Sequence, residues 1–211
     1  MTTLVEHLDK IKHLIAPATE LSIDVLEGGY SNKVYCLSWR DRPRWVLRVP
    51  GLDADDFMIS RISEKIALRE AQEAQISPSC LYFEDASGLM VSQFVVQKAF
   101  DWQVDHNDYD ILRLAKSTQL IHKMSSNQTH YDLKNIILTY LECCEKKLSK
   151  DDLLRQEIGF LQDLSFSYLD RIRLFTPVMC HNDINPKNCL TDDLHFWVID
   201  WEYAGMGDAL F

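Results

Sequence analysis

Residues 180–205 read C-H-N-D-I-N-P-K-N-C-L-T-D-D-L-H-F-W-V-I-D-W-E-Y-A-G, and this stretch decides the fold. It places His181, Asp183, Asn188 and Asp200 at positions that we expect to be loops, with short apolar runs between them. A solvated surface would scatter its carboxylates more widely, and a hydrophobic core would exclude them. The pattern therefore indicates that these polar groups share one site.

The spacing within this stretch suits a catalytic loop followed by a metal-binding hairpin. Asp183 and Asn188 are five positions apart, so one loop can aim a carboxylate at a substrate hydroxyl and a carboxamide at a metal ion, with Pro186 restricting its course. Asp200 follows Asn188 by twelve residues, a length that fits a compact β-hairpin whose two ends lie together. We therefore expect Asn188 and Asp200 to lie side by side as oxygen ligands for Mg²⁺. A single loop Asp is far more often a turn former, but the whole pattern is more specific than that.

The composition describes an ordinary soluble protein and excludes several functions. The 211 residues are 46% hydrophobic and 26% charged, with a net charge of −10 that argues against a nucleic-acid partner and suits a cationic substrate. No apolar run approaches the ~20 residues of a membrane helix, so we expect no membrane insertion. The six cysteines form no C-x-x-C pair, which favours free thiols and a cytoplasmic location.

Periodicity predicts a β-rich first half and a helical second half. The first half, residues 1–97, has a short amphipathic helix within 3–15 and a helix near 54–75. Its strands form antiparallel connections at 21–27, 33–39 and 45–49 and a hairpin at 80–84 and 89–96. The second half, residues 98–211, has helices near 108–125, 131–148 and 151–171, then the catalytic loop and the metal-binding hairpin. We interpret these halves as two lobes.

The motifs C-H-N-D-I-N-P-K-N and I-D-W-E-Y-A-G resemble those of the choline/ethanolamine kinase and aminoglycoside phosphotransferase superfamily. Within it, the chain is most similar to bacterial choline kinases of the LicA type and to thiamine kinases. The resemblance implies an α+β, bilobal, protein-kinase-like fold: an N-lobe with an antiparallel β-sheet and one helix, and a mainly helical C-lobe. The chain stops at G-M-G-D-A-L-F, so we expect a C-terminal truncation that removes the family's final helices.

The resemblance also implies roles for the residues of the C-terminal motif. Asp183 would be the catalytic residue that accepts or orients the proton of the substrate hydroxyl, and Asn188 and Asp200 would hold Mg²⁺. Glu202 and Tyr203 would meet the acceptor. His181 is expected to brace the loop.

In the first half, the resemblance implies a nucleotide site. Arg48 stands where protein kinases place a lysine, and its fork suits phosphate oxygens. Glu64 is our choice for the carboxylate that orients it, although Glu70 and Glu73 are close in sequence. Other expected nucleotide-binding residues belong to the glycine turn and to the hinge that meets the adenine: Gly28, Gly29, Ser31, Asn32, Gln93 and Val95.

These expectations define a kinase that uses ATP and Mg²⁺ to phosphorylate a small cationic alcohol. Choline or ethanolamine is the leading acceptor, and charge does not separate these from thiamine. Aminoglycosides are a weaker third option. A different class of function stays open, because a chain without the final helices could bind nucleotide without turnover.

Overall fold

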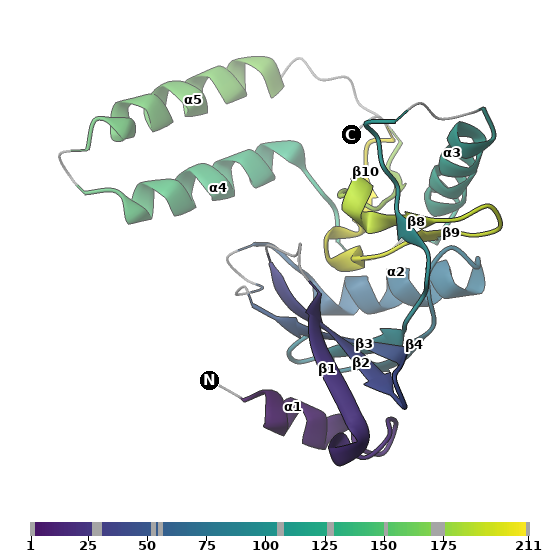
Figure 1. The fold of residues 1–211 in the computed structure, drawn as a ribbon. Helices are drawn as coiled ribbons and strands as arrows, with labels where there is room; N and C mark the ends of the chain where they lie inside the picture. The colour runs from purple at the N-terminus through teal and green to yellow at the C-terminus, as the bar shows by residue number, and fades with distance from the viewer. Residues whose placement is uncertain are drawn as a thin grey trace.

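The structure, a computed structural model, describes residues 3–26, 31–51, 54, 57–104, 108–125, 129–149, 152–169 and 176–209. It is a mixed fold of antiparallel sheets and helices (Figure 1). The α-helices are α1 (Leu4–Ile11), α2 (Arg61–Glu73), α3 (Asp108–His122), α4 (Leu133–Lys147) and α5 (Leu154–Leu169). The strands are β1 (Leu21–Leu26), β2 (Asn32–Trp39), β3 (Arg42–Pro50), β4 (Cys80–Phe83), β5 (Met90–Gln93), β6 (Lys98–Ala99), β7 (Val178–Cys180), β8 (Cys189–Thr191), β9 (Phe196–Val198) and β10 (Gly205–Gly207).

The first half folds into a five-stranded antiparallel sheet in the order β1-β2-β3-β5-β4. Alternation along β3 gives this sheet two different faces. Leu47 and its neighbours on one face pack with Leu8 and Ile11 of α1, whereas Arg48 on the other face reaches α2. The sheet therefore presents its apolar face to α1 and aims a cation at the opposite side.

Helix α2 begins later than the sequence pattern predicts. We expected a helix near residues 54–75, but the first helical residue is Arg61, because Ser60 is the N-cap and its hydroxyl accepts from the N–H of Ser63. Met58 has a positive φ of 54°, which no helix tolerates. Apolar spacing extended the prediction too far toward the N-terminus, and capping chemistry sets the true boundary.

The second half packs around α2 through a separate hydrophobic core. Ala67, Leu68 and Ala71 of α2 contact this core. Its other members include residues from α3 and from the C-terminal strands: Ile121, Met179, Cys189, Val198, Trp201 and Met206. Helix α2 therefore connects the five-stranded sheet to the small sheets β10-β7 and β6-β8-β9, which carry the C-terminal motif.

Helices α4 and α5 form a hairpin that projects from the rest of the chain (Figure 1). They pack against each other, and α4 has no fully buried residue. Large apolar side chains of α5 are exposed to solvent, including Phe160 and Tyr168. The apolar side chains that predicted these helices are thus only partly covered by other described residues.

The division into lobes at residues 97 and 98 stays a prediction. The sheet nevertheless ends near this point, because the strand after β5 is β6, which pairs with β8 of the C-terminal motif. Among the described residues, no helix is both long and apolar enough to cross a membrane.

Replacing Leu47 with Ala should destabilise the protein strongly. Its side chain is fully buried between the sheet and α1, so truncation removes apolar contacts and leaves a cavity. We expect a loss of about 3 kcal/mol in the free energy of unfolding, measured by urea denaturation. The control is Leu81→Ala, because Leu81 lies on β4 with 44% of its surface exposed. Equal losses in the two variants would contradict the described core.

Candidate active site

The catalytic loop begins directly after β7 and ends in a 3-10 turn, Pro186–Asn188. The Asp183 carboxylate accepts hydrogen bonds from the carboxamides of Asn185 (3.0 Å to Oδ1) and Asn188 (2.8 Å to Oδ2). The same two amide groups also reach the Asp183 carbonyl, at 3.3 and 3.0 Å. The loop thus fixes the orientation of one partly exposed carboxylate with donors from both flanking asparagines.

His181 is buried and has both ring nitrogens engaged. Its Nδ1 accepts from the N–H of Asp183 at 3.3 Å, so the proton belongs on Nε2, which donates to the carbonyl of Ile199 at 3.1 Å. The ring also contacts the edge of Trp201, with 4.7 Å between ring centroids. Burial lowers the pKa of His181 to about 4, so the ring is neutral at physiological pH. This geometry ties the catalytic loop to the following hairpin and leaves no ring nitrogen free for proton transfer.

The hairpin β8-β9 returns the chain to the catalytic loop, as its length predicts. Cys189 pairs with Val198, and the N–H of Ile199 donates to the carbonyl of Asn188 at 2.9 Å. Asn188 therefore lies beside the residue that immediately precedes Asp200. Asp200 itself has a φ of 65°, a left-handed conformation that Asp tolerates better than most residues and that is often found at functional positions.

A buried arginine connects this hairpin to the five-stranded sheet. Nη2 of Arg48 lies 2.5 Å from Oε1 of Glu64, and Nη1 lies 3.3 Å from Oδ1 of Asp200. The second contact spans 152 positions of sequence. Arg48 also donates to the carbonyl of Gly88 at 3.1 Å and is only 3% exposed. The structure thus brings the predicted guanidinium together with a predicted metal ligand.

The two alternative carboxylates lie elsewhere. Glu70 accepts from the N–H of Ser125 at 2.7 Å, and Glu73 lies 3.9 Å from Nε of Arg69 on the helix surface. Glu64 is the member of this group of three that contacts Arg48. Of the sequence-based choices, the structure supports Glu64 as the orienting carboxylate.

Glu202 points toward the five-stranded sheet, and its contact with an acceptor stays a prediction. Its carboxylate is buried and accepts from Ser31 (2.7 Å), Asn32 (3.1 Å) and Arg61 (3.4 Å). An ionised carboxylate has about four acceptor sites, so these three donors use most of the hydrogen-bonding capacity of Glu202. Sequence proximity to Asp200 suggested substrate contact, but the 3-10 turn Trp201–Tyr203 directs Glu202 toward the five-stranded sheet.

Arg61 is the main site residue that the sequence analysis left without a role. Its Nη1 lies 2.7 Å from Glu64 and 3.4 Å from Glu202, so it joins two buried carboxylates. The helical i,i+3 spacing of Arg61 and Glu64 was the available signal. Gly88, with a positive φ of 79°, packs directly on the Arg61 side chain, and a Cβ at this position would collide with it.

The charges of this cluster do not balance. Arg48 and Arg61 face three carboxylates, those of Glu64, Asp200 and Glu202. Burial, together with the negative charge of Glu202, raises the pKa of Asp200 to about 7, although Arg48 opposes the shift. The cluster therefore carries excess negative charge when Asp200 is ionised, which a bound cation would offset.

The donor set fits Mg²⁺ as the family resemblance implies. Asn188 uses its N–H groups on Asp183, which leaves its amide oxygen available, and Asp200 contacts Arg48 through Oδ1 alone. Carboxylate and amide oxygens are the ligands that this ion prefers, with water and phosphate oxygens completing its shell. No cluster of three or more His, Cys, Asp or Glu side chains that could hold a metal occurs among the described residues.

The expected nucleotide-binding residues are only partly placed. Gly28 and Gly29 lie outside the described residues. Gln93 donates its N–H to the carbonyl of Ser79, so that group is not available to an adenine edge. Val95 has no backbone partner within the part of the chain that the structure describes, and its N–H and carbonyl suit the hinge role better.

Three tyrosines, Tyr131, Tyr140 and Tyr203, interact electrostatically with one another beside the charged cluster. Burial raises the pKa of Tyr203, and the nearby charges of Glu202, Asp183 and Asp200 contribute. Burial also raises the pKa of Tyr131, whose hydroxyl has no partner among the described residues. Tyr140 of α4 contributes to both shifts. Tyr131 and Tyr140 were not singled out from the sequence, because an isolated Tyr carries no motif.

The five-stranded sheet, the buried Arg48–Glu64 pair that joins it to α2 and the loop-hairpin motif together define a protein-kinase-like fold. A sequence model of the choline/ethanolamine kinase family matches residues 23–208, and the chain belongs to this family.

Similar proteins support this assignment at low identity. Protein LicA of Haemophilus influenzae (strain ATCC 51907 / DSM 11121 / KW20 / Rd) is 23% identical over 176 residues, which cover 80% of this chain and 63% of the relative. The choline kinase LicA from Streptococcus pneumoniae shares the fold, with a TM-score of 0.77, 19% identity and coverage of 96% of this chain and 69% of that one. A structure of LicA in complex with AMP gives a TM-score of 0.73 at 18% identity, covering 99% and 72%. The chain thus spans less than two thirds of the length of its curated relative.

His181 should make stability depend on pH in the acidic range. Its folded pKa of about 4 lies below the usual 6.5, so the unfolded chain takes up the proton first as the pH falls. Stability is therefore lost between pH 6.5 and 4, by about 3 kcal/mol at 1.36 kcal/mol per pKa unit. Urea unfolding across this range should show a smaller loss in His181→Asn and an unchanged loss in the exposed-site control His13→Asn. An identical pH dependence in His181→Asn and the wild type would contradict a buried neutral imidazole.

Glu202→Gln should act on stability rather than on the acceptor. The change removes the charged acceptor of Ser31, Asn32 and Arg61, and hydrogen bonds to a charged group contribute about 2 kcal/mol each at most sites. We expect the free energy of unfolding to fall by about 2 kcal/mol. The exposed Glu142→Gln serves as the control. A normal stability combined with a raised KM for the acceptor alone would instead support the contact of Glu202 with the acceptor.

Proposed function

We propose that this protein transfers the γ-phosphoryl group of ATP to the hydroxyl of a small cationic metabolite. The observation that carries this proposal is the contact of Arg48 with both Glu64 and Asp200. One guanidinium from the sheet thereby lies next to a carboxylate suited to a metal ion. Phosphoryl transfer depends on this combination of a phosphate-binding cation, metal ligands and a positioned carboxylate.

Arg48 would bind the α- and β-phosphates, held in orientation by Glu64. Its guanidinium is planar and keeps further N–H groups, including Nε, which is buried without a partner among the described residues. Ser31 and Asn32 donate to Glu202, which would hold these two residues near the nucleotide, and Gly28 and Gly29 stay expected nucleotide-binding residues. The backbone of Val95 would meet the adenine edge, whereas Gln93 fits this role less well.

Asn188 and Asp200 would hold Mg²⁺, which supplies positive charge to the phosphate oxygens and offsets the charge that develops there. Burial and the nearby negative charge of Glu202 raise the pKa of Asp200, and a cation bound beside it would favour the ionised form. Within the chain, the hairpin β8-β9 keeps both ligands in register through the bond between Ile199 and Asn188. Precise placement of these oxygens is the contribution of the protein.

Asp183 would orient the acceptor hydroxyl and take its proton during transfer. The side chain of Asn185 donates to one oxygen of this carboxylate and that of Asn188 to the other. These bonds would orient Asp183 toward the acceptor hydroxyl before the reaction. His181 holds the loop through its bonds to Asp183 and Ile199, and it is a positioning residue.

The acceptor would be choline or ethanolamine, with thiamine and then aminoglycosides as alternatives. Support comes from the family assignment and from Tyr203, which interacts electrostatically with Glu202, Asp183 and Asp200. Aromatic faces attract ammonium groups, and nearby carboxylates add to the attraction. A net charge of −10 would also favour the approach of a cation. The net negative charge and the free cysteines agree with a cytoplasmic enzyme.

A second candidate function is nucleotide binding without turnover. The observation that favours it is the projecting α4-α5 hairpin, whose apolar residues have few contacts among the described residues. An acceptor site that includes Tyr140 of α4 would then be poorly fixed. Nucleotide binding depends on Arg48 and would persist.

The decisive test is release of ADP with Mg-ATP and a panel of choline, ethanolamine, thiamine and an aminoglycoside. We expect turnover with one acceptor, reduced about 10³-fold in Asp183→Asn, because loss of a positioned general base costs about 10²–10⁴ in rate. Asp193→Asn, an exposed change in the β8-β9 turn, should keep full activity. Nucleotide-dependent thermal stabilisation without turnover would favour the second candidate. Neither response in a folded sample would reject both functions.

A further inference from the structure

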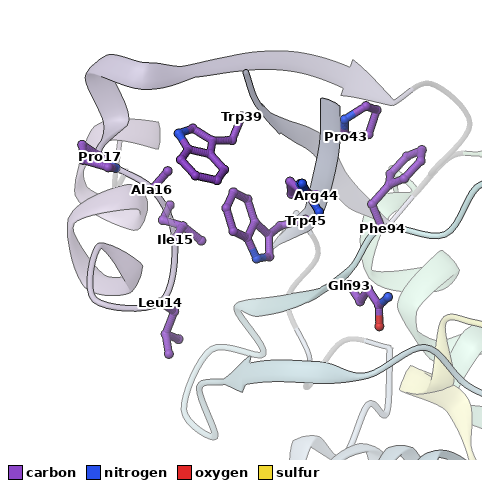
Figure 2. Close-up of a pocket in the computed structure, with 10 residues that line it drawn as sticks. All are labelled: Leu14, Ile15, Ala16, Pro17, Trp39, Pro43, Arg44, Trp45, Gln93 and Phe94. Atoms are coloured by element: carbon purple, nitrogen blue, oxygen red, sulfur yellow. The ribbon is translucent and has the colours of Figure 1, made fainter. Parts of the chain in front are cut away.

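A second cavity lies on the outer side of the five-stranded sheet (Figure 2). Its volume is about 580 Å³. The walls are formed by the segment after α1, by the connection of β2 and β3, and by the end of β5. The lining residues are Leu14, Ile15, Ala16, Pro17, Trp39, Pro43, Arg44, Trp45, Gln93 and Phe94.

The cavity is separate from the active site because the sheet lies between them. Trp45 and Leu47 share one face of β3 and pack in the core with Ile11 of α1. Arg48 lies on the opposite face and contacts Glu64 and α2. A ligand beside Trp45 therefore cannot contact the phosphate-binding guanidinium.

Aromatic rings dominate the interior of the cavity. Figure 2 shows the indoles of Trp39 and Trp45 close together, with Phe94 on the far wall. Both indoles are only partly buried, although an apolar core is adjacent to them. Exposed faces of two neighbouring indoles are suited to stacking against a planar ring.

The polar groups of the cavity are cationic or neutral. Arg44 is the one charged side chain in the lining, and it has no ion-pair partner among the described residues. Glu20 accepts from Nε1 of Trp39 at 2.9 Å and is not part of the lining. Arg44 therefore gives the lining a positive charge in a chain of net charge −10.

The walls are held in place by contacts of their own. Trp39 is fixed by Glu20 and by the guanidinium of Arg40, 4.4 Å from its ring centroid. The N–H of Phe94 donates to the carbonyl of Arg44 at 3.0 Å, which joins the end of β5 to β3. The Trp39 ring and the junction of β3 with the end of β5 are therefore held in place without a ligand.

We propose that this cavity is a second small-molecule site, for a planar aromatic ring that bears an anionic group. The ring stacks on Trp39 and Trp45, and the anionic group pairs with Arg44. The volume falls within the range of about 300–1,000 Å³ that is usual for ligand pockets. Gln93, at the end of β5, also belongs to the lining (Figure 2).

The test uses two probes that differ only in charge, indole-3-acetate and indole-3-acetamide. Binding is followed by the five tryptophan indole signals in ¹H–¹⁵N NMR spectra, with Trp45→Phe assigning one of them. We expect saturable shifts of the Trp39 and Trp45 signals, and indole-3-acetate should bind about tenfold more tightly than the amide. The Trp201 signal, which belongs to the buried core beside the active site, should not shift.

Two matched variants isolate the role of Arg44. Arg44→Gln should abolish the tenfold preference for the acid, whereas Arg42→Gln, an equally exposed change on the same strand, should keep it. The proposal is overturned if the Trp39 and Trp45 signals do not move at millimolar probe, or if both probes bind equally to the wild type. It is also overturned if Mg-ADP displaces indole-3-acetate competitively, because the probe would then occupy the nucleotide site.

Discussion

The structure depends on a buried cluster of two guanidinium groups and three carboxylates. Arg48 and Arg61 are taken out of water only because Glu64, Asp200 and Glu202 compensate their charge. The contributing residues come from β3, α2 and the C-terminal hairpin, so the cluster can form only when the two halves of the chain are docked. The ion pairs therefore fix how the sheet and the catalytic loop are oriented relative to each other. Burial of the apolar core around α2 stabilises the contact between the two halves.

The catalytic loop is organised by short-range hydrogen bonds that act on top of this docking. Asn185 and Asn188 orient Asp183, and His181 joins the loop to Ile199 next to Asp200. Each of these bonds is local to the C-terminal motif. The internal geometry of the motif thus depends on its own hydrogen bonds. The charged cluster determines how the motif is oriented toward the five-stranded sheet.

Two faces of one sheet carry two different chemistries. The inner face presents Arg48 to carboxylates, and the outer face presents Trp45 to α1 and to the second cavity. Strand alternation is the reason from Trp45 to Arg48, where successive residues of β3 point in opposite directions. The pairing shifts register opposite Leu37 and Ser38, and at this irregularity Arg44 and Trp45 both line the cavity.

The sequence by itself determined the elements and the local geometry of the site. Apolar periodicity located the helices and strands, and the spacing from Asn188 to Asp200 implied the hairpin that the structure contains. Glu64 was selected over Glu70 and Glu73 by resemblance alone. The docking of the two halves is what turns Glu202 toward Ser31 and Arg61, brings Arg61 into the cluster and places Tyr203 near Asp183. The physical reason is the sequence separation of the interacting residues. Hydrogen bonds within a loop and the alternation along a strand depend on residues that are neighbours in the sequence. Pairing of buried charges more than a hundred positions apart depends on how the halves dock, which no local pattern encodes.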